Sequence, residues 1–183
     1  LTSHGSCRMC IVEIEGRPNM PTACTTPVED GMIVRTDTAP LHAMRVELFK
    51  LLLSEHPASC LFCEEKSHCD ECMVTLRKTG VTTGCRSCPD DGMCELQVLA
   101  DRFHLTEEGG YPVRYRMLPP ETRGPFFDRD YNLCILCERC VRVCAENHFS
   151  SVVALTKRGT NTVVGTPFGR SLLQAGCHFC GAC

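Results

Sequence analysis

Seventeen cysteines among 183 residues constrain this chain more than any other feature, because most of them stand two residues apart. Two residues between cysteines direct both thiolates to one metal centre, whereas a disulfide between such close neighbours gains little loop-closure entropy. The spacing therefore favours metal or iron–sulfur sites over a disulfide scaffold. The cysteines form three groups: Cys7, Cys10 and Cys24; Cys60, Cys63, Cys69, Cys72, Cys85, Cys88 and Cys94; and Cys134, Cys137, Cys140, Cys144, Cys177, Cys180 and Cys183.

The rest of the composition excludes two classes of partner. A formal net charge of -3 gives no basic face for nucleic acid. No apolar run is long enough to span a membrane, and no signal peptide is visible. A reducing cytoplasm suits free thiolates, so we expect a cytoplasmic location. Leu1 is not a methionine and Cys183 ends inside a motif, so we expect a segment of a longer protein, and twin-arginine export remains an alternative.

The third group carries the strongest local motif. Cys134-x2-Cys137-x2-Cys140-x3-Cys144 matches the bacterial ferredoxin run, in which three thiolates bind one [4Fe-4S] cluster and the fourth cysteine binds the other. By this crossed order, Cys144 joins Cys177, Cys180 and Cys183 on one cluster. The set of Cys134, Cys137 and Cys140 then needs a fourth ligand about four residues beyond Cys183.

The first group has three ligands in a segment with strand and turn signals. A [2Fe-2S] cluster needs four, so we expect the fourth upstream of Leu1. The alternative is an incomplete zinc site.

The middle group offers seven thiolates, and His56 makes eight ligands for two centres. One partition gives Cys60, Cys63, Cys69 and Cys72 to one centre and His56, Cys85, Cys88 and Cys94 to another. The other gives His56, Cys60, Cys63 and Cys69 to one, and Cys72, Cys85, Cys88 and Cys94 to the other. A neutral imidazole in place of a thiolate should raise the reduction potential of its cluster.

We predict an α+β chain made of small modules, because metal binding can supply folding energy that a small core cannot. The modules are a partial [2Fe-2S] ferredoxin-like β-grasp sheet (1–38), a His/Cys iron–sulfur domain with an extra cysteine-rich insertion (39–110), a linker (111–125) and a 2[4Fe-4S] ferredoxin-like domain (126–183). Apolar periodicity and turn residues predict helices near 40–56, 73–78, 94–105 and 138–146, and strands at 11–15, 32–36, 152–154 and 162–164.

Four motifs together resemble a known iron–sulfur region. They are Gly5-Ser6-Cys7-Arg8-Met9-Cys10-Ile11-Val12-Glu13, His56-Pro57, Cys94-Glu95-Leu96-Gln97 and Gly176-Cys177-His178-Phe179-Cys180-Gly181-Ala182-Cys183. The order is similar to the N-terminal region shared by formate dehydrogenase alpha subunits, the large iron–sulfur subunit of complex I and [FeFe] hydrogenases. In these families the Glu-Leu-Gln end closes the histidine-ligated cluster. The resemblance therefore implies that His56, Cys85, Cys88 and Cys94 share a [4Fe-4S] cluster, with Cys60, Cys63, Cys69 and Cys72 as an additional iron–sulfur or zinc centre.

Among these families, Arg158-Gly159-Thr160 and Gly165-Thr166-Pro167-Phe168-Gly169-Arg170 look most like formate dehydrogenases. The resemblance implies an electron-transfer segment with a [2Fe-2S] cluster and three or four [4Fe-4S] clusters. It also implies a molybdopterin active site in a domain outside this chain, and an electron-carrier subunit or an NAD(P)- or ferredoxin-linked diaphorase subunit as partner. No catalytic residue is expected within the chain. The rival interpretations are the equivalent segment of a hydrogenase or complex I-like subunit and, from another class, a zinc-binding interaction module.

Overall fold

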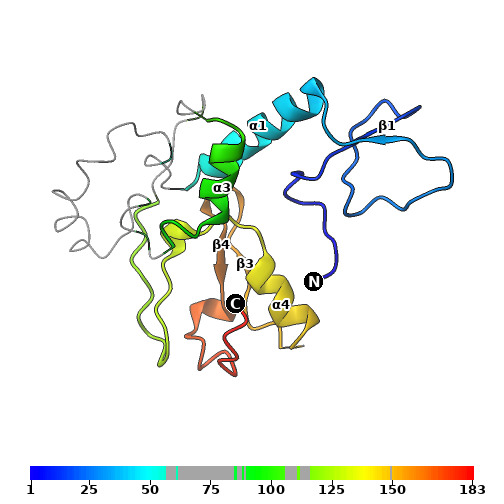
Figure 1. Cartoon of the computed structure of the whole chain (residues 1–183). Coiled ribbons are helices and arrows are strands. Elements are labelled where there is room, and N and C mark those ends of the chain that lie inside the picture. The colour runs from blue at the N-terminus through cyan, green and yellow to red at the C-terminus, as the bar shows by residue number, and fades with distance from the viewer. Residues whose placement is uncertain are drawn as a thin grey trace.

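The computed structural model describes residues 1–56, 61, 85, 88, 90–105, 111, 116–148 and 150–183. Within these ranges the chain forms small helices and two two-stranded antiparallel sheets (Figure 1). The predicted α+β class is confirmed, while the β-grasp and ferredoxin-like topologies stay predictions. The predicted helix near 73–78 lies outside the described residues. The elements are β1 (Glu13–Ile14), β2 (Val34–Arg35), α1 (Ala39–Leu53), α3 (Glu95–Arg102), η5 (Tyr131–Leu133), α4 (Arg139–Glu146), β3 (Ala154–Thr156), η6 (Gly159–Asn161), β4 (Val163–Gly165) and η7 (Pro167–Gly169).

The N-terminal sheet is shorter than the sequence pattern predicted. Strand β1 pairs with β2 with Glu13 opposite Arg35, and Ile11 makes an isolated bridge to Thr22. The turn after β1 uses Gly16 at φ +79°, a region that costs glycine little. The regular pairing is brief, so this part of the chain consists mostly of loops around a small sheet.

Helix α1 begins where the sequence predicted and buries a different stripe. The Leu41 N–H donates to the Thr38 hydroxyl at 3.4 Å, which caps the first turn. The buried side chains Leu41, Phe49 and Leu53 are separated by eight and four residues and therefore lie on one face. The apolar periodicity also predicts Met44 and Leu51 on the core face, but both are exposed and Phe49 is buried instead.

Helices α1 and α3 pack against each other around Phe49, Leu53 and Ala100. The Phe49 ring also lies 5.6 Å from that of Phe103, centroid to centroid. Figure 1 shows the two helices side by side, α1 in cyan and α3 in green. This packing brings the residues that follow α1 close to the residue that precedes α3.

A second core lies under the C-terminal cysteines. Strand β3 pairs with β4 through Leu155 and Val164, and the buried residues Val152, Val153, Val164 and Leu172 form the cluster. The predicted strand at 152–154 begins two residues late, at Ala154, because Val152 and Val153 enter the core before pairing begins. Four cysteines pack on this cluster: Cys134, Cys140, Cys144 and Cys177.

Polar contacts connect the parts of the chain. The Thr2 N–H donates to the Glu146 carboxylate at 2.7 Å, so the N-terminal segment lies beside α4 (Figure 1). Arg45 of α1 donates to the Ile11 carbonyl at 2.6 Å. Among the described ranges, no helix is both long and apolar enough to cross a membrane.

Candidate iron–sulfur sites

The first site gathers Cys7, Cys10 and Cys24 next to the N-terminal sheet. The Ala23 N–H donates to the Cys10 carbonyl at 2.9 Å, which holds the two loops together. A hydrogen bond with Cys10 raises the pKa of the Cys24 thiol, and the nearby Cys7 acts in the same direction. The three thiols therefore lie near one another, as ligands of one multi-iron cluster would.

Gly5 supports this site through its backbone. Its φ is +70°, and an added Cβ would lie 3.2 Å from the Thr22 hydroxyl and 3.3 Å from the Thr25 methyl. The backbone of Gly5 also hydrogen-bonds Cys24 and acts to lower the pKa of that thiol. A side chain at this position would therefore move an N–H donor away from the sulfur.

The second site is a narrow cavity between the end of α1 and the start of α3. Its lining contains His56, Cys85, Cys88 and Cys94, together with Asp90, Asp91, Gln97 and Leu133. Gln97 fixes the loop around it by accepting from the Gly92 N–H at 2.8 Å and donating to Asp91 at 2.7 Å. The Asp90 N–H lies 3.5 Å from the Cys88 sulfur. These contacts give Gln97 of the Cys94-Glu95-Leu96-Gln97 motif a positioning role.

His56 has the surroundings of a ligand. Burial lowers the pKa of its imidazole, and a hydrogen bond with the backbone of Leu133 acts in the opposite direction. The buried Nδ1 has no hydrogen-bond partner among the described residues. A neutral imidazole nitrogen beside three thiols and without a protein partner fits a metal-bound group. Four further predicted ligands lie outside the described residues: Cys60, Cys63, Cys69 and Cys72.

The two C-terminal C-x2-C-x2-C loops have the same backbone. Leu136 and Phe179, each two residues after the first cysteine, have φ of 56° and 53°. Their N–H groups donate to the sulfurs of Cys134 and Cys177, both at 3.4 Å. Glu138 and Gly181, one residue after the second cysteine, are also left-handed. Successive N–H groups in such a conformation form a concave nest for an anionic group.

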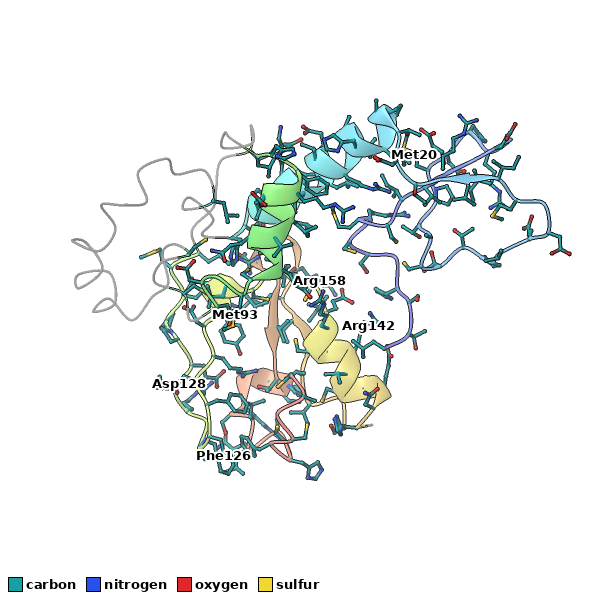
Figure 2. The ribbon with its side chains drawn as sticks, in the orientation of Figure 1. Met20, Met93, Phe126, Asp128, Arg142 and Arg158 are labelled. Atoms are coloured by element: carbon teal, nitrogen blue, oxygen red, sulfur yellow. The ribbon has the colours of Figure 1, made fainter. Side chains whose placement is uncertain are left out.

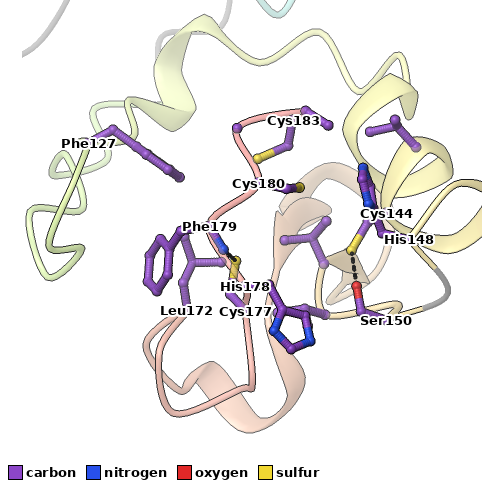
Figure 3. Close-up of a pocket in the computed structure, with 15 residues that line it drawn as sticks. Phe127, Cys144, His148, Ser150, Leu172, Cys177, His178, Phe179, Cys180 and Cys183 are labelled. Atoms are coloured by element: carbon purple, nitrogen blue, oxygen red, sulfur yellow. Dashed lines mark hydrogen bonds between the residues drawn. The ribbon is translucent and has the colours of Figure 1, made fainter.

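One of these loops closes a cavity of about 250 Å³ that holds Cys144, Cys177, Cys180 and Cys183 (Figure 3). The Ser150 hydroxyl lies 3.3 Å from the Cys144 sulfur. Burial acts to raise the pKa of Cys144, but Ser150 and the backbone of residues 151–153 lower it overall. His148 and His178 lie at the margin of the cavity in Figure 3. The rest of the wall is mainly apolar and consists of Phe127, Val143, Val152, Val153, Leu172 and Phe179. The predicted set of four cysteines therefore lines one pocket, with Cys144 and Cys177 half-buried and Cys180 and Cys183 exposed.

The other loop places Cys134 and Cys140 half-buried and Cys137 at the surface. Burial raises the pKa of both Cys134 and Cys140, and neighbouring thiols raise it further. Cys183 is one of the thiols that act on Cys140, so the two C-terminal sites adjoin. Within the described part of the chain, no three His, Cys, Asp or Glu side chains converge closely enough to hold a single metal ion.

An exposed ion pair lies where three of these sites meet. Arg139 of α4 donates to the Glu95 carboxylate at 2.7 Å, and Glu95 directly follows Cys94. The Glu95 contact raises the pKa of Arg139, and the thiols Cys137 and Cys7 add to the effect. The first site therefore lies near the Cys134–Cys140 loop.

Comparison with known proteins identifies this arrangement. A family model described as "2Fe-2S iron-sulfur cluster binding domain" matches residues 1–39. The NADP-reducing hydrogenase subunit HndD of Solidesulfovibrio fructosivorans is 34% identical over 97% of this chain and 26% of its own length. The NADH-ubiquinone oxidoreductase 78 kDa subunit of Neurospora crassa is 32% identical over 92% of this chain and 19% of its own length. The chain is related to these iron–sulfur subunits.

A solved structure extends the relation to the fold. The crystal structure of an NAD⁺-reducing [NiFe]-hydrogenase in the H₂-reduced state matches with a TM-score of 0.69 and 26% identity, over 92% of this chain and 61% of that one. The present chain spans about a quarter or less of the length of the curated proteins that it matches.

Sequence reasoning missed several residues of the sites. Leu133 and Phe127 line cavities without belonging to a cysteine motif. Phe126, at the tip of the 116–130 segment in Figure 2, lies with its ring 5.1 Å from that of Phe179. The only local signal was the Phe126-Phe127 pair beside a proline, and a pair of apolar residues does not reveal what it covers.

Proposed function

We propose that this chain is the iron–sulfur electron-relay segment of a multi-subunit, NAD(P)-linked oxidoreductase. The observation that carries the proposal is the proximity of neighbouring thiol sites. Leu133 lines the His56 cavity and directly precedes Cys134, and Cys140 adjoins Cys183. Short separations between successive centres are what one-electron transfer through a protein requires.

The protein would contribute ligands, burial and hydrogen bonds, because bound clusters themselves supply the one-electron chemistry. We assign Cys7, Cys10 and Cys24 to a [2Fe-2S] cluster, and Cys134, Cys137 and Cys140 to a [4Fe-4S] cluster, each with one further ligand from outside this chain. We assign a second [4Fe-4S] cluster to Cys144, Cys177, Cys180 and Cys183. The N–H donors at Leu136, Phe179 and Asp90 would stabilise negative charge on the ligand sulfurs.

For the middle group we propose the partition in which His56, Cys85, Cys88 and Cys94 share one [4Fe-4S] cluster. Their common cavity and the unpartnered Nδ1 of His56 support it. Cys60, Cys63, Cys69 and Cys72 then form an additional iron–sulfur or zinc centre. The module boundaries at 38, 110 and 125 are part of the same proposal.

The catalytic partner is a finer proposal. The relatives described above favour a hydrogenase-type or NADH:quinone-type complex with a diaphorase or other electron-carrier subunit, in the cytoplasm. The motifs Arg158-Gly159-Thr160 and Gly165–Arg170 support the alternative of a molybdopterin-dependent formate dehydrogenase. These motifs form η6, β4 and η7, and residues 165, 166, 168 and 169 line an open cavity of about 670 Å³. The identity of a catalytic domain that packs on this face would distinguish the hydrogenase-type or NADH:quinone-type complex from the formate dehydrogenase.

Metal and sulfide analysis of the anaerobically purified full-length protein tests the proposal. Five filled centres contain about 18 irons, counting two for the [2Fe-2S] cluster and four for each of the others. A zinc-occupied additional centre lowers this to about 14 irons and one zinc. The Cys180→Ser variant should lose one [4Fe-4S] signal in electron paramagnetic resonance (EPR) spectra, and exposed Ser3→Ala is the control. A preparation that binds zinc alone would refute the proposal and support an interaction module.

A further inference from the structure

The segment that the sequence marked as a linker contributes a buried charge. Arg116 has only 7% of its side chain exposed. Its guanidinium makes an ion pair with Glu55 and donates to the Thr162 carbonyl at 2.8 Å. Its Nε is buried and has no hydrogen-bond partner among the described residues. A buried arginine needs such partners, because an unpaired charge in the interior costs several kcal/mol.

The partners of Arg116 belong to two different sites. Glu55 directly precedes His56, whose side chain lines the second cavity. Thr162 directly precedes β4, and Val164 of β4 belongs to the core on which Cys134 and Cys140 pack. One side chain therefore connects the end of α1 to the support of the first ferredoxin-type loop.

The neighbouring backbone strengthens this connection. The Leu118 N–H donates to the Asn132 amide oxygen at 2.9 Å, and the Asn132 amide donates back to the Leu118 carbonyl at 2.7 Å. Asn132 is buried within η5, which leads directly to Leu133 and Cys134. Residues 116–118 are thus fixed against the turn that lies between the two sites.

The charge of Arg116 lies near the Cys134 loop. The hydrogen bonds between Leu118 and Asn132 hold this segment against η5, which Cys134 directly follows. A buried positive charge near a cluster favours the extra negative charge that the reduced cluster carries.

We propose that Arg116 is a positioning residue that couples the two sites: it fixes His56 beside Leu133 and its charge raises the reduction potential of the cluster at Cys134, Cys137 and Cys140. In the transfer, the cluster at His56 loses one electron and the cluster at Cys134 gains it. The inference rests on the proposed function, since it requires clusters at both sites.

The test is an EPR-monitored redox titration of the full-length holoprotein and its Arg116→Gln variant. We expect the equilibrium constant for reduction of the Cys134-site cluster to fall about tenfold, which is 59 mV for a one-electron couple. The Cys137→Ser variant identifies the signal by its loss. Arg123→Gln is the matched control, because Arg123 comes from the same segment, pairs with Glu121 and is 61% exposed. Solvent screens its charge, so its potential should stay at the wild-type value.

Glu55→Gln provides a second, opposite test. It removes the negative partner of Arg116 and should shift the same potential upward. It should also loosen His56 and lower iron retention at that site. If Arg116→Gln does not assemble its clusters, the inference is tested by Glu55→Gln alone. An upward shift of the potential in Glu55→Gln then supports the inference, and an unchanged potential overturns it. Equal potentials in wild type, Arg116→Gln and Arg123→Gln would overturn the inference alone. A wild-type protein without clusters would overturn the proposed function as well.

Discussion

Replacement of Phe49 by alanine should destabilise the folded chain by about 3–5 kcal/mol. The Phe49 ring is fully buried, packs on Leu53 and Ala100, and makes a tilted contact with Phe103. Two helices form the walls around it, so the site cannot collapse onto the space that the ring leaves. We therefore expect the upper half of the range, which is a large share of the 5–15 kcal/mol of a typical domain.

The same change should affect the His56 site before the others. Phe49 holds α1 against α3, and these helices place His56 beside Cys94. We expect Phe49→Ala to lose iron from this site at urea concentrations that leave the Cys144–Cys183 cluster intact. The assay is anaerobic urea unfolding, followed by circular dichroism and by iron released to a chelator.

Val98→Ala is the control for this experiment, because Val98 lies on α3 with 67% of its surface exposed. Its cost should stay within about 0.5 kcal/mol. Two outcomes would contradict the argument that α1–α3 packing organises the His56 site. One is a free energy of unfolding of Phe49→Ala within about 1 kcal/mol of that of Val98→Ala, which is about one tenth of a typical stability. The other is equal release of iron from both variants.

Three further predictions follow from the sites. His56→Cys should lower the potential of its cluster, because a thiolate adds a negative charge where the imidazole was neutral, and an unchanged potential in an EPR titration would contradict the assignment. Burial acts to raise the pKa of Glu121, but Arg129 and Tyr131 lower it overall. The contribution of Glu121 to the free energy of unfolding is therefore fully present above the unfolded pKa of about 4.3 and is lost as pH falls through the folded pKa. Glu121→Gln should therefore cost about 2 kcal/mol at pH 7 in urea unfolding and almost nothing in strong acid, and a pH-independent cost would refute this account. Iron removal by a chelator should abolish amide protection in 126–183, whose described core has only four buried members, and full protection in the metal-free chain would show that the core suffices.

The sequence predicted helices α1, α3 and α4 well because their signals depend on local spacing. Thr38 caps the start of α1, and Pro40 lies in its first turn. The pattern did not distinguish Phe49 from Leu51, since both are apolar and only the position of α3 decides which is covered. The two N-terminal strands were predicted too long, and the two C-terminal strands were predicted with the observed length but begin one or two residues later.

For the sites, the sequence yields candidate ligand sets, and these stay predictions. Spacing alone left two partitions for His56, because Cys60 and Cys85 both begin suitable motifs. The meeting of His56 with Leu133, across more than seventy residues of sequence, depends on tertiary packing that no local pattern carries. The same holds for Arg116, which in the sequence is one arginine among many in a stretch rich in prolines.

The shared backbone of the two C-terminal loops has an unequal cost at one matching position. Gly181 takes a left-handed conformation that glycine tolerates well, whereas Glu138 accepts about 1 kcal/mol of strain there. The Glu138 carboxylate lies 3.4 Å from His4, so the strained loop is also the one that contacts the N-terminal segment. The strained position therefore carries a side chain that attaches the loop to the start of the chain, a contact that glycine could not make.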